Sequence, residues 1–244
     1  MPASMIQARG LAIGFNGRAV FCDVNLEVVE GESAVVIGPS GGGKSVLLKV
    51  LCGLLTPDAG TVELGSDDLG MLFQRNALFD SMTCEENLTF PLAERKGIVG
   101  SEARDRAGRM LAAVGLAGNE RLFPDEISGG MQKRLGIARA LIVEPRILLY
   151  DEPTAGLDPV TSRIIAALML EVSGRAGGAR GRTTLLTVTN DMQRAYQIAD
   201  RIYFMARGGL REGGSPAAVQ GTADPELRQF IYGLAQGPLT AARV

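Results

Sequence analysis

The sequence predicts an α/β fold in which a parallel β-sheet is interrupted by a helical segment. Short apolar runs at 34–37, 147–150 and 184–189 are typical of strands buried on both faces, and each precedes a segment with helical periodicity. Strands that alternate with helices in this way imply a parallel sheet. Between about 75 and 144 only helical periodicity is found. We therefore expect an α/β core with an inserted α-helical subdomain.

The other elements follow from local patterns. Residues 5–13 and 24–29 alternate apolar and polar side chains and predict two strands joined across 14–18, an antiparallel β edge to the core. Proline suits the first turn of a helix, so one helix is expected from Pro159 to about 172. Further strands are predicted at 61–64, 69–73 and 201–205, and further helices at 46–51, 84–94, 101–114, 131–142 and 191–199.

The chain is expected to form one domain over 1–244, with its core in 1–74 and 145–215, the helical subdomain in 75–144 and a C-terminal helix and tail in 216–244. Its first residues lack the charged and apolar regions of a secretory leader. No run approaches the roughly 18 apolar residues of a membrane span. We expect a cytoplasmic protein.

Composition argues against several classes of function. The net charge is −2 and no basic run is present, so no nucleic-acid partner is expected. The chain contains no histidine, which excludes histidine-based catalysis and histidine metal ligands. Its three cysteines are scattered without C-x-x-C spacing, which favours neither a disulfide framework nor a zinc site.

One glycine-rich stretch carries a specific chemical signal: Gly38-Pro39-Ser40-Gly41-Gly42-Gly43-Lys44-Ser45. It matches the phosphate-binding pattern G-x-x-x-x-G-K-[ST], in which backbone N–H groups surround phosphate oxygens. Lys44 is expected to place its charge against the β- and γ-phosphates, and the Ser45 hydroxyl to ligate Mg²⁺. The alternative is a glycine-rich surface turn. A predicted strand before the loop and a helix after it favour the nucleotide site.

Two carboxylates, Asp151 and Glu152, follow the apolar strand at 147–150. Asp151 could reach the Mg²⁺ of a phosphate loop, and Glu152 could orient or deprotonate an attacking water. Without the loop upstream, an ordinary acidic turn would be the better interpretation. Ser128, Gly129 and Gly130 open a predicted helix, where Ser128 is a candidate N-cap and the glycines expose N–H groups to an anion. Alone, that signal is weak.

The order of these motifs resembles the nucleotide-binding subunit of ABC transporters over essentially the whole chain. Gly38–Ser45 is similar to Walker A, 127–132 to the LSGGQ signature and 147–152 to Walker B. Gln74 falls at the Q-loop position, where it would join Ser45 and Asp151 around Mg²⁺. Asp158 falls in the D-loop, and Phe15 at the place of the aromatic that stacks on adenine. The resemblance implies a P-loop NTPase (RecA-like) core that uses ATP and Mg²⁺.

The resemblance also implies the mechanism. Two copies are expected to form a head-to-tail dimer around two ATP molecules, the phosphate loop of one copy facing Ser128–Gly130 of the other. An integral-membrane permease would hold the dimer at the cytoplasmic face of the inner membrane. A switch histidine is typical after the strand 184–189, yet Asn190 stands there. Asparagine can donate a hydrogen bond but cannot become cationic. We expect retained ATP binding and slowed hydrolysis. Met131 replaces the usual signature glutamine and leaves the Ser-Gly-Gly donors in place.

A finer resemblance is to the ATPases of Mla/MCE-type phospholipid transporters. It rests on Leu72-Phe73-Gln74, on stretches within 77–92, on the Ser-Gly-Gly-Met signature and on the tail from Arg228 to Pro238. It implies an MCE-domain protein and a small STAS-domain protein as partners. In the tail, Leu227, Phe230, Ile231 and Leu234 have helical spacing that could present an apolar stripe to the opposite subunit. The alternative is a helix that packs on its own core.

Two rival functions differ in class. The first is a hydrolysis-impaired, nucleotide-gated dimer switch, marked by Asn190. The second is an ABC ATPase of translation or DNA repair. Those proteins usually carry two cassettes or a long coiled-coil insertion, and this chain has room for neither.

Overall fold

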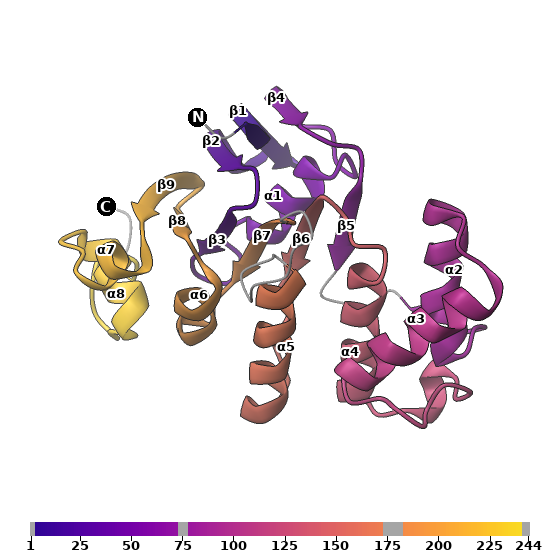
Figure 1. Ribbon diagram of the computed structural model, residues 1–244. Coiled ribbons are helices and arrows are strands. Elements are labelled where there is room, and N and C mark those ends of the chain that lie inside the picture. The colour runs from indigo at the N-terminus through magenta and orange to yellow at the C-terminus, as the bar shows by residue number, and fades with distance from the viewer. Residues whose placement is uncertain (1–2, 73–77, 173–182, 241–244) are drawn as a thin grey trace. The chain divides into compact units, whose positions relative to one another are not determined.

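The structure, a computed structural model, describes residues 3–72, 78–172 and 183–240, without the side chains of 171 and 172. It divides into two compact units (Figure 1). The first unit comprises the residues up to 67 and those from 184 onward, and the second comprises 68–183. No helix among the described residues is long and apolar enough to cross a bilayer.

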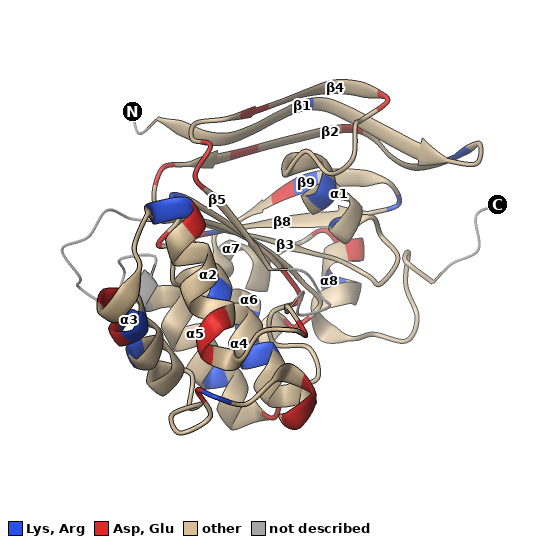
Figure 2. Ribbon diagram, turned by 90° about the vertical axis from the view of Figure 1, so that its right-hand side faces the viewer, with Lys and Arg blue, Asp and Glu red and all other residues tan. Residues whose placement is uncertain are grey.

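The first unit carries an antiparallel sheet in the order β2-β1-β4, seen edge-on in Figure 2. Its strands are β1 (Ser4–Phe15), β2 (Arg18–Val29) and β4 (Ala59–Leu64). The turn residues between β1 and β2, Asn16 and Gly17, have φ of 52° and 74°, as a two-residue hairpin turn requires. Register shifts interrupt the β1–β2 pairing. They break the period-two alternation, which explains why the prediction placed the start of β2 too late.

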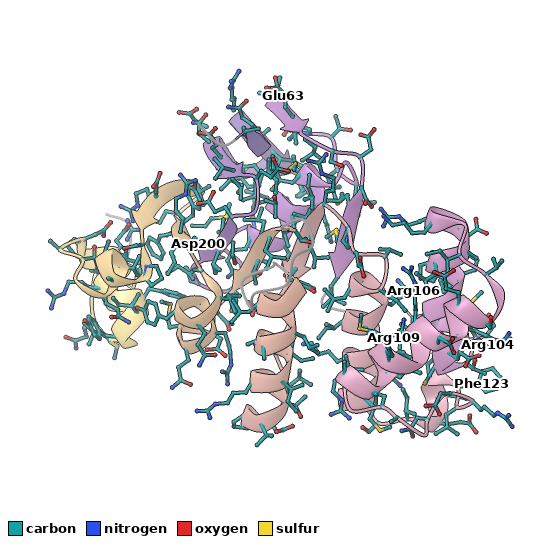
Figure 3. All side chains as sticks on the ribbon, viewed as in Figure 1. Glu63, Arg104, Arg106, Arg109, Phe123 and Asp200 are labelled. Atoms are coloured by element: carbon teal, nitrogen blue, oxygen red, sulfur yellow. The ribbon has the colours of Figure 1, made fainter. Side chains whose placement is uncertain are left out.

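In a second sheet region of this unit, β3 (Ser33–Ile37) lies between β7 (Thr184–Thr189) and β8 (Arg201–Ala206). Both pairings of β3 are parallel. β9 (Gly209–Gly214), which was not predicted, pairs antiparallel with β8. All five residues of β3 are buried. At its start, Asp200 (labelled in Figure 3) accepts a hydrogen bond from the Ser33 backbone N–H at 2.9 Å, and the Asp200 N–H donates to the Ser33 carbonyl at 2.7 Å.

Four helices complete the described part of the first unit. α1 (Lys44–Leu51) contacts β7, and α6 (Met192–Ile198) contacts β3. α7 (Pro216–Gln220) and α8 (Pro225–Tyr232) follow β9. The sequence predicted a C-terminal helix and tail, and α7 is too short for its periodicity to be recognised.

The second unit pairs β5 (Leu69–Leu72) in parallel with β6 (Ile147–Asp151). Its helices are α2 (Cys84–Lys96), α3 (Gly100–Ala113), α4 (Gly129–Leu141) and α5 (Pro159–Val172), with a 3₁₀ turn at Pro124–Glu126. α2 packs on α3 and α4, and α4 contacts β5 and α5. The predicted fold class is confirmed: parallel strands, an antiparallel β subdomain and a helical insert.

Candidate nucleotide site

Lys44 closes the glycine-rich loop on itself. The loop leaves β3 after Ile37, and Lys44 is the first residue of α1. The Lys44 Nζ donates to the carbonyl oxygen of Gly38 at 2.7 Å and to that of Pro39 at 3.1 Å. The side chain is almost completely buried. A positive charge is thereby fixed inside the loop, at the N-terminal end of a helix.

The glycines shape the loop as a cradle that side chains would fill. Gly38 has φ of 151°, and a Cβ added there would lie 2.0 Å from the carbonyl oxygen of Met205. Gly43, the N-cap of α1, has φ of 97° and offers no side-chain cap. A glycine N-cap, unlike a serine or aspartate N-cap, has no side-chain oxygen of its own to accept from the N–H groups of the first helical turn. These groups and Lys44 suit a chain of phosphates.

The β1–β2 hairpin covers one side of this loop. A Cβ on Gly43 would lie 3.0 Å from Val20 Cγ1 of β2 and 3.1 Å from Met205 Cε of β8. The same hairpin carries Phe15, whose side chain is 45% exposed. A pocket of about 310 Å³ is lined by other residues of the hairpin, among them Gly14, and by Asp58, whose Oδ2 accepts from the Gly14 N–H at 2.8 Å. The hairpin thus offers an exposed ring, as the predicted adenine contact requires.

Asn190 follows β7 at the end of the sheet where the phosphate loop follows β3. In the parallel pairing of β3 and β7, Thr189 is the partner of Ile37, the last residue before the loop. Asn190 directly follows Thr189, is exposed, and precedes Asp191, whose Oδ1 accepts from the Arg194 N–H at 3.2 Å to cap α6. The structure therefore brings the predicted switch position and the phosphate loop to the same sheet edge.

The second unit holds the predicted Walker B carboxylates. Asp151 ends β6 and is 4% exposed. Glu152 follows with φ of 51°, a left-handed conformation that is rare for residues other than glycine. Gln74, the predicted Q-loop residue, lies outside the described residues.

Ser128 and Asp158 are both helix caps. The Ser128 Oγ accepts from the Met131 N–H at 3.3 Å at the start of α4, where Ser128 and Gly129 are exposed. The Asp158 Oδ1 accepts from the N–H groups of Val160 at 2.9 Å and Thr161 at 3.0 Å. The hydrogen bond from the Thr161 hydroxyl is the main reason why the pKa of Asp158 is lowered. Contacts of Ser128, Gly129, Gly130 and Asp158 with nucleotide stay predictions.

Lys133 was missed by the sequence analysis. It lies in the first turns of α4, and its Nζ donates to the carbonyl oxygens of Glu152, at 3.1 Å, and Ala155. A signal was available, because Lys133 shares the helical spacing of the buried Gly136, Ile137 and Ala140. A lysine on the apolar face of a helix indicates a buried acceptor.

Comparisons with known proteins decide the family. The sequence profile of the family described as ABC transporter matches residues 21–155. The chain belongs to the ABC transporter ATP-binding family. It is an ABC ATPase, and its hydrolysis of ATP is coupled to transport.

Three curated proteins are similar to this ABC ATPase over nearly its whole length. It is 38% identical to the probable ribonucleotide transport ATP-binding protein mkl of Mycobacterium leprae, over 96% of this chain and 70% of that protein. It is 35% identical to the chloroplastic protein TRIGALACTOSYLDIACYLGLYCEROL 3 of Arabidopsis thaliana, over 96% and 75%. It is 32% identical to the intermembrane phospholipid transport system ATP-binding protein MlaF of Escherichia coli, over 97% and 92%.

Solved structures agree. A dimeric bacterial ABC transporter cassette superposes with a TM-score of 0.76 at 31% identity, covering 86% of this chain and 98% of that one. A dimeric post-hydrolysis cassette bound to ADP and Pi has the same TM-score at 30% identity and the same coverage. The ABC cassette is a dimer in both, and the family works with a permease.

Proposed function

We propose that this ABC ATPase powers the movement of phospholipid or another hydrophobic molecule between bacterial membranes. The observation that supports it most is the match to MlaF, an intermembrane phospholipid transport ATPase by name, over 97% of this chain and 92% of that protein. The Arabidopsis relative is also named for a lipid. The competing cargo is ribonucleotide, favoured by the higher identity to mkl, which is matched over a smaller share of its length.

Roles at the nucleotide site are proposed for the residues of the predicted motifs, and two copies of the chain are proposed to contribute to each site. In the first unit, Phe15 would stack on adenine, and Gly38–Ser45 would surround the phosphates. In the second unit, Glu152 would orient or deprotonate the attacking water. We assign Ser45, Gln74 and Asp151 to Mg²⁺, which when bound would neutralise charge on the phosphates. Ser128–Gly130 would serve the nucleotide held by the partner copy.

The permease contact is proposed to lie on the helical part of the second unit. An open groove of about 640 Å³ runs between α2 and α3, and Met82, Phe90, Ile98 and Val99 line it with Glu85, Glu86 and Arg104. Val99 and Phe90 are exposed, although they are large and apolar. Arg104, labelled in Figure 3, lies on α3, where Figure 2 shows charges of both signs. A groove lined by both apolar and charged side chains suits an amphipathic helix of a membrane protein.

The test uses the complex that a tagged chain retains from bacterial membranes. An integral-membrane permease, an MCE-domain protein and a STAS-domain protein are expected to co-purify, and the complex is expected to lie on the cytoplasmic face of the inner membrane. Reconstituted in donor vesicles, it should move a fluorescent phospholipid to acceptor vesicles when ATP is present, and the Glu152→Gln complex should not. ATP-dependent accumulation of ribonucleotide without lipid transfer would replace this proposal with the mkl-like function.

A further inference from the structure

Lys133 joins the helix that carries the signature segment to the turn that carries Glu152. It lies one helical turn after Gly129, the first residue of α4, and only 8% of it is exposed. Its Nζ donates to the backbone carbonyls of Glu152 and Ala155. Both contacts lie within the second unit, so they depend on nothing outside it.

The turn that Lys133 holds is strained. Glu152 is a non-glycine residue with φ of 51°, in the left-handed region that is unfavourable for side chains with a Cβ. The turn has two backbone hydrogen bonds, from the Ala155 N–H to the Glu152 carbonyl and from the Leu157 N–H to the Thr154 carbonyl, both 3.2 Å long. A left-handed conformation persists only where surrounding contacts determine it. The ammonium group supplies such a contact, since it draws two carbonyls of the turn to one point.

Burying a lysine is unfavourable unless its charge has acceptors. Burial lowers the pKa of Lys133, and the nearby charges of Glu152 and Asp151 oppose that shift. The adjacent Gln132 also acts locally, because its Nε2 donates to the Pro124 carbonyl at 2.7 Å and so holds the loop before the signature segment. Gln132 of α4 thereby holds the loop at Pro124, and the next residue, Lys133, holds the turn at Glu152.

We propose that Lys133 is a positioning residue for ATP hydrolysis, which fixes the backbone of the Glu152–Ala155 turn from the signature helix. The inference rests on the proposed roles of Glu152 and Ser128–Gly130. In a head-to-tail dimer, the start of α4 serves the nucleotide of the partner, whereas Glu152 serves its own. Lys133 is then a direct contact between the parts of one subunit that act in two different ATP sites.

The test compares Lys133→Met, which keeps length but removes the charge, with Lys133→Arg and with Lys49→Met. Lys49 is an exposed lysine in the last turn of α1 and serves as the matched control. Hydrogen exchange of the intact protein measures directly how well the backbone amides of the turn are protected. The amides of Ala155 and Leu157 should exchange at least about tenfold faster in Lys133→Met and near the unmodified rate in the other two variants. Unchanged exchange at both amides would overturn the proposal.

Kinetics of the assembled complex provide the second readout. Lys133→Met should lower kcat at least about tenfold while the Kd for ATP stays within about twofold, and Lys133→Arg should recover part of the lost rate. A merely structural lysine would lower the melting temperature and leave the kcat of the folded protein unchanged, which would contradict the proposal. If the unmodified complex hydrolyses no ATP above the Glu152→Gln background, the proposed function fails, and the exchange experiment, which needs no turnover, still decides the role of Lys133.

Discussion

The Nζ of Lys44 lies 2.7 Å from the carbonyl oxygen of Gly38, at the opposite end of the phosphate loop. One side chain thus holds the loop closed and places a cation where phosphates are expected. A second contact, to the Pro39 carbonyl, fixes the direction of the ammonium group.

Lys44→Ala should therefore weaken ATP binding at least about tenfold, because hydrogen bonds to a charged group contribute roughly 1.5–3 kcal/mol. Titration with a fluorescent ATP analogue measures the change. Lys49→Ala, in the same helix but exposed, should bind as the unmodified chain does. Equal affinity in both variants would refute the assignment of this loop.

Two alanine substitutions in the same loop should differ in stability. Gly38→Ala places a Cβ 2.0 Å from the Met205 carbonyl oxygen, so the free energy of unfolding should fall by roughly 3 kcal/mol. Gly41→Ala meets no atom within 4 Å and bears only the left-handed φ of 76°, so about 1 kcal/mol is expected. Urea unfolding measures both values. Equal losses of stability in the two variants would show that the Met205 carbonyl does not restrict residue 38.

Glu152→Gln should keep ATP binding and trap a dimer, since the amide cannot deprotonate an attacking water. Size-exclusion chromatography with ATP and Mg²⁺ should show about twice the monomer mass. The double variant Lys44→Ala/Glu152→Gln is the control and should stay monomeric. A Glu152→Gln protein that elutes as a monomer with and without nucleotide would count against the composite site.

A truncation that tests the role of the C-terminal tail has to spare α8. Leu227 of the predicted stripe is buried, and the Phe230 ring lies 5.7 Å from the Phe204 ring of its own unit, so removing 226–244 would damage the core. The buried Gln229 of α8 holds the tail that follows the helix. Its Nε2 donates to the Leu234 carbonyl at 3.2 Å, and its Oε1 accepts from the Leu239 N–H at 2.6 Å.

Removal of 234–244 alone should lower the melting temperature less than removal of 226–244, because α8 stays in place and only partners of Gln229 are lost. It should also weaken the dimer or the complex with the permease, because the exposed Leu234 lies in the removed segment. Analytical ultracentrifugation of the truncated chain measures the effect. Intact assembly after this truncation would favour the alternative in which α8 only covers its own core.

The elements that the sequence predicted well have a strong local signal. The strand at 184–189 was placed to the residue, and the helix from Pro159 to about 172 corresponds to α5, because an uninterrupted apolar run and an N-terminal proline mark them. The early half of β2 was missed where bulges break alternation, and β9 (Gly209–Gly214) was missed because half of its six residues are glycine, which has low β propensity.

In the candidate site, too, features with a local sequence signal could be predicted, and features that depend on contacts between distant segments could not. A loop motif such as Gly38–Ser45 can be predicted because its chemistry is contiguous in sequence. The position of Asn190 at the same end of the sheet as the loop follows from the Ile37–Thr189 register, which no local pattern contains. Lys133 acts through a contact between segments far apart in sequence, so its partners could not be predicted from its own surroundings.

The central claim is that this chain is a working ATPase in which Glu152 is catalytic and Asn190 slows turnover. Steady-state ATP hydrolysis by the assembled complex tests it most directly, with the unmodified chain, Asn190→His and Glu152→Gln compared side by side. The account predicts that the unmodified chain hydrolyses ATP above the Glu152→Gln background and that Asn190→His is faster. Hydrolysis by the unmodified chain at the Glu152→Gln level, with ATP still bound, would contradict it and support the nucleotide-gated switch.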